Sequence, residues 1–61
     1  MYEKFRDEMY ATNDLEKVYS IYDRANAAYR DGLLTTIEIC GLSMLCDDRS
    51  REIEIILAQL N

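Results

Sequence analysis

The chain has 61 residues and a formal net charge of −5, and it contains no histidine, proline or tryptophan. Hydrophobic residues make up 49% and charged residues 31%, which is typical of a folded domain and excludes a disordered segment. The length predicts a single domain over residues 1–61, and twelve acidic against seven basic residues disfavour nucleic-acid binding.

The first expected helix covers residues 2–11. Tyr2, Phe5 and Met9 recur there at helical spacing and form one apolar side. A helix of this length is marginal on its own, so we expect it to dock on the rest of the chain.

The second expected helix covers residues 14–31. Asn13 is the expected N-cap, with the Glu16 side chain reaching back to it. Arg30 in the last turn suits the negative end of the helix dipole, and Gly32 can adopt the left-handed conformation that ends a helix. One apolar stripe follows the helix at Leu15, Val18, Tyr22, Ala25 and Tyr29, widened by Ile21 and Ala28.

A capping box is expected to open the next helix. Thr35 is the N-cap and Glu38 is the third helical residue, while Leu34 and Ile39 can form a hydrophobic staple around them. Because only about three residues separate the two helices, they are expected to fold back as an antiparallel hairpin around Gly32. The predicted fold class is therefore all-α, a small bundle of three or four helices built on this hairpin.

The remaining residues predict helices over 36–46 and 49–60, with Asp47 or Asp48 as the second cap. The 36–46 helix is apolar nearly all round, which predicts burial on several sides, either as the central element of the fold or as part of an interface. Gly41 can let another helix approach closely. The two helices can also fuse into one rod. A single heptad seam then runs through Ile39, Leu42, Cys46, Ile53, Ile56 and Leu60, interrupted only by Arg49.

We expect no cofactor, no metal site and no small-molecule substrate. Cys40 and Cys46 are six residues apart, point about 120° away from each other on a helix, and are expected to be core thiols. Without histidine or a second cysteine pair, a closed zinc site is implausible. Asp47, Asp48 and Glu52 lack the spacing of a calcium loop and are explained by helix capping and ion pairing.

Catalysis is not expected, so the chain is predicted not to be an enzyme. It offers no histidine as a general base, no glycine-rich phosphate loop and no activating partner for its serines. A bundle of this size also has little room for a pocket of several hundred Å³.

Tyrosines and the apolar seam supply the candidate interface. Tyrosine is enriched at binding interfaces, and Tyr10 and Tyr19 lie off the apolar sides of their helices. The alternative is that the tyrosines line the rim of a thin core. The expected interface residues are Tyr10, Tyr19, Ile39, Leu42, Cys46 and Ile55.

Residues 22–45 resemble the SHOCT type of short helical hairpin. The shared features are an aliphatic or aromatic helix that ends in Gly32, two leucines, Thr35, Glu38 and Ile39. This resemblance covers less than half of the chain and implies a hairpin that takes part in oligomerisation and protein contacts. Residues 40–42 replace the lysines usual in that family, so we transfer the hairpin and no specific function. The whole chain is loosely similar to small acidic accessory proteins of phages and mobile elements.

Three functions remain open. The first is a non-enzymatic helical interaction module that self-associates, expected as a homodimer. The second is an acidic regulator that binds a larger host protein, with nucleic-acid mimicry as one form of it. The third is a DNA-binding helix-turn-helix, supported only by Arg49 and Arg51. No secretory signal or membrane span is apparent, so the expected location is the cytoplasm and no membrane partner is expected.

Overall fold

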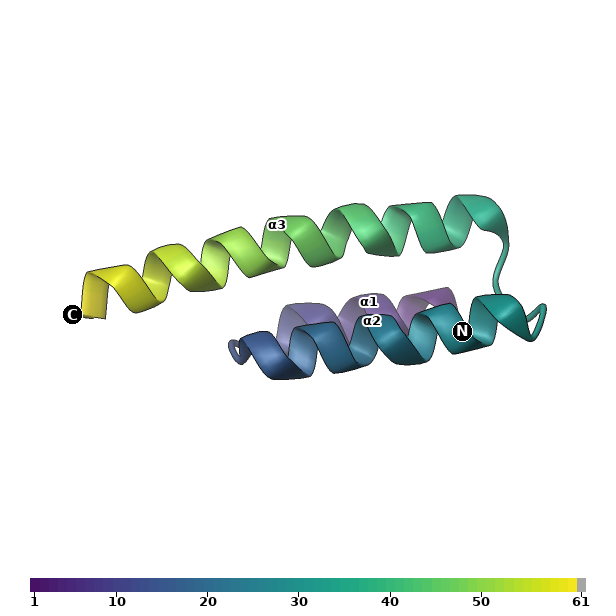
Figure 1. Ribbon diagram of the computed structural model, residues 1–61, viewed down its shortest axis with the longest axis horizontal. Helices are drawn as coiled ribbons and strands as arrows, with labels where there is room; N and C mark the ends of the chain where they lie inside the picture. The colour runs from purple at the N-terminus through teal and green to yellow at the C-terminus, as the bar shows by residue number, and fades with distance from the viewer. Residues whose placement is uncertain (61) are drawn as a thin grey trace.

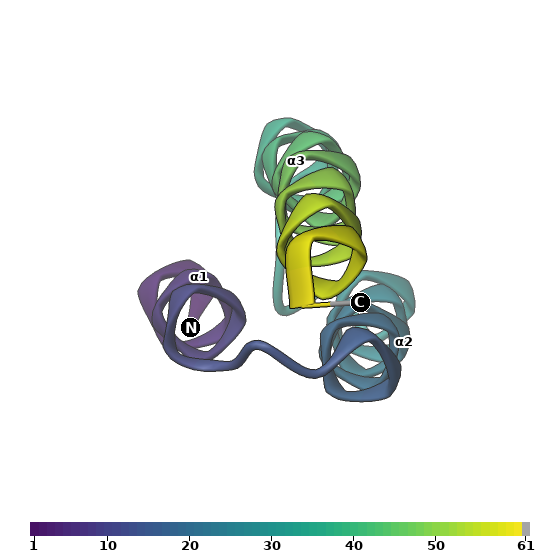
Figure 2. The same ribbon diagram turned by 90° about the vertical axis from the view of Figure 1, so that its left-hand side faces the viewer.

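The computed structural model describes residues 1–60, which form three α-helices: α1 (Tyr2–Ala11), α2 (Leu15–Arg30) and α3 (Thr36–Leu60). The all-α prediction is confirmed. Each helix contacts the other two, and the molecule is elongated, measuring 42 × 16 × 15 Å. In Figure 1, α2 and α3 run in opposite directions, and Figure 2 shows α1 and α2 side by side with α3 packed across both.

The connection between α1 and α2 corrects one predicted cap. Asp14, rather than Asn13, is the N-cap of α2, and its carboxylate accepts a hydrogen bond of 2.9 Å from the Glu16 backbone N–H. Both residue types cap helices well, so composition did not separate the two positions. The Asn13 side-chain oxygen instead accepts a hydrogen bond from Arg49 of α3.

The turn between α2 and α3 follows the expected local chemistry. Gly32 has φ +80°, and its N–H donates to the Tyr29 carbonyl at 3.0 Å. The Leu33 N–H donates to the Ala28 carbonyl at 2.9 Å, which completes a Schellman motif. The Thr35–Glu38 capping box is confirmed, with reciprocal hydrogen bonds of 2.9 and 3.1 Å.

The C-terminal half forms one helix of 25 residues rather than separate helices over 36–46 and 49–60. Asp47 and Asp48 lie inside α3 and cap nothing at that position. No glycine or proline lies between residues 46 and 49, where the break was expected. The polar Arg49 on the seam has a hydrogen-bond partner in α1, so nothing forces the helix to break there. Of the two alternatives, the structure adopts the fused rod.

The core lies along the line where the three helices meet. Met9, Val18 and Leu42 are fully buried at its centre, one from each helix. On α2 the buried stripe consists of Val18, Ile21, Ala25 and Ala28, whereas Tyr29 is exposed. The full set of buried apolar residues is Phe5, Met9, Val18, Ile21, Ala25, Ala28, Leu34, Ile39, Leu42, Cys46 and Ile53.

The expectation that α3 is the central element, buried on several sides within the chain, is wrong. Its seam faces α1 and α2, but on the opposite side Ile37 is 85% exposed and Met44 is 69% exposed. Two short helices cover one face of a third helix, and no fourth helix exists among residues 1–60 to cover the other.

Replacing Gly41 with alanine is expected to raise the free energy of unfolding by about 0.5–1 kcal/mol, because glycine is a poor helix former. An added Cβ would lie 3.7 Å from Tyr2 Oη and 3.8 Å from Tyr2 Cε2, which are ordinary contacts. Urea unfolding followed by circular dichroism measures the change. A lower free energy of unfolding would show that Tyr2 needs the space.

Candidate interaction surfaces

Three of the six predicted interface residues lie inside the chain's own core. Ile39, Leu42 and Cys46 are buried against α1 and α2, and Leu42 has no exposed surface. The prediction that these three contact another molecule is therefore wrong for the folded chain. Periodicity identified a packing seam correctly, but it could not tell whether the seam faces the same chain or a second one.

The other three predicted interface residues are exposed. Tyr10, Tyr19 and Ile55 belong to α1, α2 and α3 respectively. Ile55 follows the buried Ile53 by two residues, so it points away from the core. No hydrogen bond joins any of the three to another among the residues described. They therefore stay separate candidates rather than one assembled site.

The seam of α3 continues beyond the helices that cover it. Ile53 is the last buried residue of the seam, at 1% exposed, whereas the next seam residues, Ile56 and Leu60, are 43% and 76% exposed. Leu57, one turn after Ile53, extends the same side of the helix and is 46% exposed. We call residues 54–60 the projecting end; at 1.5 Å per residue it is about 10 Å long. Figure 1 shows this end extending past the connection between α1 and α2. It presents a core-type apolar face without a partner in the chain.

Arg49 is the polar residue whose role the sequence did not reveal. It is 7% exposed, and its Nε donates to the Met9 carbonyl at 3.1 Å. One terminal nitrogen donates to the Thr12 carbonyl at 2.7 Å and to the Asn13 side-chain oxygen at 3.1 Å. The other forms a 2.7 Å ion pair with Glu52. Arg49 therefore holds the C-terminal end of α1 against α3.

The buried position of Arg49 weakens the helix-turn-helix hypothesis. Arg49 is one of the two residues that supported it, and its guanidinium is occupied by carbonyl oxygens at the end of α1. A group buried in this way is not available to a DNA phosphate. Arg51 is exposed and remains as the only support. The signal that could have identified Arg49 as structural is its position on the apolar seam.

The two cysteines occupy different environments. Cys46 is buried, and burial raises the pKa of its thiol above the ordinary value. Cys40 is exposed, so the expectation that both are core thiols is wrong for Cys40. It lies on the outer side of α3, between the exposed Ile37 and Met44 along the helix.

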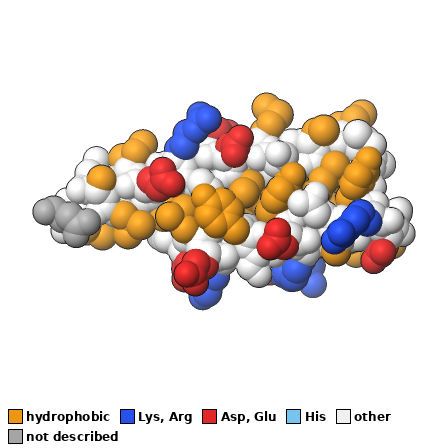
Figure 3. Space-filling model, viewed as in Figure 1, with side chains coloured by type: hydrophobic (Ala, Val, Ile, Leu, Met, Phe, Trp, Pro, Cys, Tyr) orange, Lys and Arg blue, Asp and Glu red, His pale blue; other side chains and the backbone are white. Residues whose placement is uncertain are grey.

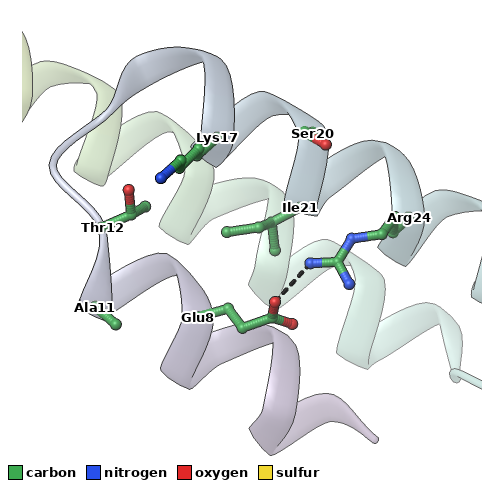
Figure 4. Close-up of a pocket in the computed structure, with 7 residues that line it drawn as sticks. All are labelled: Glu8, Ala11, Thr12, Lys17, Ser20, Ile21 and Arg24. Atoms are coloured by element: carbon green, nitrogen blue, oxygen red, sulfur yellow. Dashed lines mark hydrogen bonds and ion pairs between the residues drawn. The ribbon is translucent and has the colours of Figure 1, made fainter.

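An open groove of about 450 Å³ lies between α1 and α2. In Figure 4, Glu8 of α1 and Arg24 of α2 face each other across it and form an ion pair of 2.6 Å, with α3 behind them. The Arg24 guanidinium also lies 5.8 Å from the centre of the Phe5 ring. The other lining residues are Ala11, Thr12, Lys17, Ser20 and Ile21.

The volume of this open groove exceeds the expectation that so small a bundle has little room for a pocket of several hundred Å³. Two of its charged residues, Glu8 and Arg24, pair with each other. Because both are partly exposed, this pair joins α1 to α2 with little effect on stability. One Glu8 oxygen, Oε2, is enclosed without a hydrogen-bond partner. The lining contains no nucleophile next to a base, which is the arrangement that covalent catalysis uses.

The described residues contain neither a cluster of metal ligands nor a helix suited to cross a membrane. Within residues 1–60, no three histidine, cysteine or acidic side chains gather closely enough to hold a metal ion. None of the helices α1, α2 and α3 combines the length and the apolar character needed to cross a bilayer.

Comparison with known proteins finds no matching family model, no significantly similar curated protein and no significantly similar solved structure. The resemblance of residues 22–45 to a SHOCT-type hairpin and the looser likeness to accessory proteins of mobile elements therefore stay predictions. Functional inference for this chain depends on its own surfaces.

Proposed function

We propose that the protein is a small helical interaction module, with the antiparallel hairpin around Gly32 as its scaffold, that self-associates through the projecting end of α3. The observation that carries this proposal is the continuation of the core seam from the buried Ile53 to the exposed Leu57 and Leu60. A seam of this kind is stable in water only when another apolar surface covers it.

A second copy fits the projecting end in a simple way. Two ends related by a twofold axis can overlap in antiparallel orientation, so that each seam covers the other and the same patch serves both copies. Residues 51–60 carry Arg51 against Glu52 and Glu54, which leaves them close to neutral despite the acidic chain. Repulsion at this contact is therefore small. The pair is proposed to form in the cytoplasm.

The test is the mass in solution. At high micromolar concentration, sedimentation equilibrium is expected to give a dimer, twice the monomer mass of 7.2 kDa. Replacing both Leu57 and Leu60 with glutamine removes apolar surface from the seam. We expect at least about tenfold weaker association, since each leucine contributes about 1 kcal/mol or more when covered.

Ile37→Asn is the matched control, because Ile37 is also exposed on α3 but points away from the seam. This variant is expected to keep the wild-type mass distribution. A wild-type chain that stays monomeric at high micromolar concentration contradicts the proposal. So does a Leu57→Gln/Leu60→Gln variant that associates as strongly as wild type.

A further inference from the structure

A second apolar surface follows the outer side of α3. Ile37, Cys40 and Met44 are exposed and separated by three and four residues, so they form one stripe on the side opposite the seam. We call them the outer stripe. Figure 3 shows hydrophobic side chains standing out along the edge of the molecule over the first half of α3.

Most of the net charge of the protein lies in residues 31–48, the segment that contains this stripe. Residues 31–48 contain four acidic residues and no lysine or arginine, for a charge of −4. The rest of the chain has eight acidic and seven basic residues, which leaves −1 of the total of −5. The four acidic residues are Asp31, Glu38, Asp47 and Asp48.

Two of the four acidic residues, Asp47 and Asp48, lie at the C-terminal end of the outer stripe. Asp48 follows Met44 by four residues and extends the line of the outer stripe by one turn, and Asp47 follows Cys40 by seven residues along its edge. Both side chains are exposed, and neither forms an ion pair within residues 1–60. Glu38 adjoins Ile37 in sequence but points about 100° away from it around the helix, and one of its oxygens caps Thr35. The exposed Arg51 follows Asp47 and Asp48 by four and three residues and is the one basic residue on this side of α3, so the surface combines an apolar centre with an excess of negative charge.

We infer that the outer stripe docks a basic amphipathic helix of a partner protein. Apolar residues of such a helix would cover Ile37 and Met44, while its lysines or arginines meet Asp47 and Asp48. A second copy of this chain fits poorly here, because a twofold pair would set two copies of the same negatively charged surface against each other. Nucleic acid is excluded as the occupant by the same charge.

This inference goes beyond self-association and uses a different side of the same helix. The seam and the outer stripe lie on opposite sides of α3, so a dimer formed through the projecting end leaves both outer stripes free. The protein would then present two acidic docking surfaces to its partners.

The probe is a synthetic peptide of leucine and lysine, about 18 residues or five turns long, patterned as an amphipathic helix with one tryptophan on its apolar side. Because the protein has no tryptophan, the emission reports on the peptide alone. Titration with the protein at low salt is expected to give a saturable blue shift. Binding is expected to weaken several-fold at about 0.5 M salt, where charges are screened. A peptide with glutamate in place of lysine is expected not to bind.

Variants locate the binding surface. Ile37→Asn with Met44→Gln is expected to weaken binding at least tenfold, and Asp47→Asn with Asp48→Asn to weaken it and to reduce its salt dependence. Ile55→Asn is the matched control, an exposed isoleucine of α3 outside residues 31–48, and is expected to bind like wild type.

Three outcomes overturn the inference: equal binding of the glutamate peptide, wild-type binding by the Ile37→Asn/Met44→Gln variant, or equal loss in the Ile55→Asn control. Sedimentation of the same variants keeps the two proposals apart. Leu57→Gln/Leu60→Gln is expected to lower the mass in solution without changing peptide binding. Ile37→Asn is expected to weaken peptide binding without changing the mass.

Discussion

Arg49→Ala is expected to lower the free energy of unfolding by about 2–4 kcal/mol, a large part of the stability of so small a domain. The guanidinium donates to the carbonyls of Met9 and Thr12, and both bonds are charge-assisted. Alanine leaves the buried Met9 carbonyl without this partner and opens space between α1 and α3. Urea unfolding followed by circular dichroism measures the loss.

Three comparison variants separate the loss of hydrogen bonds from the loss of side-chain volume. Arg49→Met keeps most of the volume without any donor, so it is expected to remain destabilised, because the backbone carbonyls cannot be replaced together with the arginine. The stability of Arg49→Lys is expected to lie between those of Arg49→Met and wild type, since one ammonium group cannot reproduce the several N–H donors of the planar guanidinium. Arg51→Ala, at an exposed position, is expected to stay within about 0.5 kcal/mol of wild type. Equal stability of Arg49→Ala and Arg51→Ala would contradict the structural role.

Local chemistry was predictable because its partners are close in sequence. Gly32 and the Thr35–Glu38 capping box depend on residues within four positions of each other, and both were found where expected. The cap of α2 was missed by one position because Asn13 and Asp14 are equally suited to it. In the structure the Asn13 side-chain oxygen accepts a hydrogen bond from Arg49, 36 residues away, a contact that the local sequence does not indicate.

Long-range roles were not predictable from periodicity alone. An arginine on an apolar seam looks like a break in the pattern until the end of α1 is known to lie beside it. In the same way, Ile39 and Leu60 lie on one seam, yet the first is in the core and the second is exposed. What separates them is the length of the covering helices, 10 and 16 residues in α1 and α2 against 25 in α3. Sequence patterns show on which side of a helix an apolar seam lies, but they do not show how much of its length other helices bury.

Leu42→Ala is expected to lower the free energy of unfolding by about 2–4 kcal/mol. Leu42 has no exposed surface and packs at the centre of the core, where removing three side-chain carbons leaves a cavity. The low end of the range applies if the thin core collapses around the missing atoms. The measurement is urea unfolding at low micromolar concentration, where association contributes least.

Leu60→Ala is the matched control, the same substitution eighteen residues further along one helix. Leu60 is 76% exposed, so at low micromolar concentration this variant is expected to unfold within about 0.5 kcal/mol of wild type. At high micromolar concentration it is expected to dissociate more readily than Leu42→Ala, because its side chain belongs to the proposed contact between copies. If Leu60→Ala were as destabilising as Leu42→Ala in the monomer, the projecting end would be packed within the chain and the self-association proposal would lose its basis.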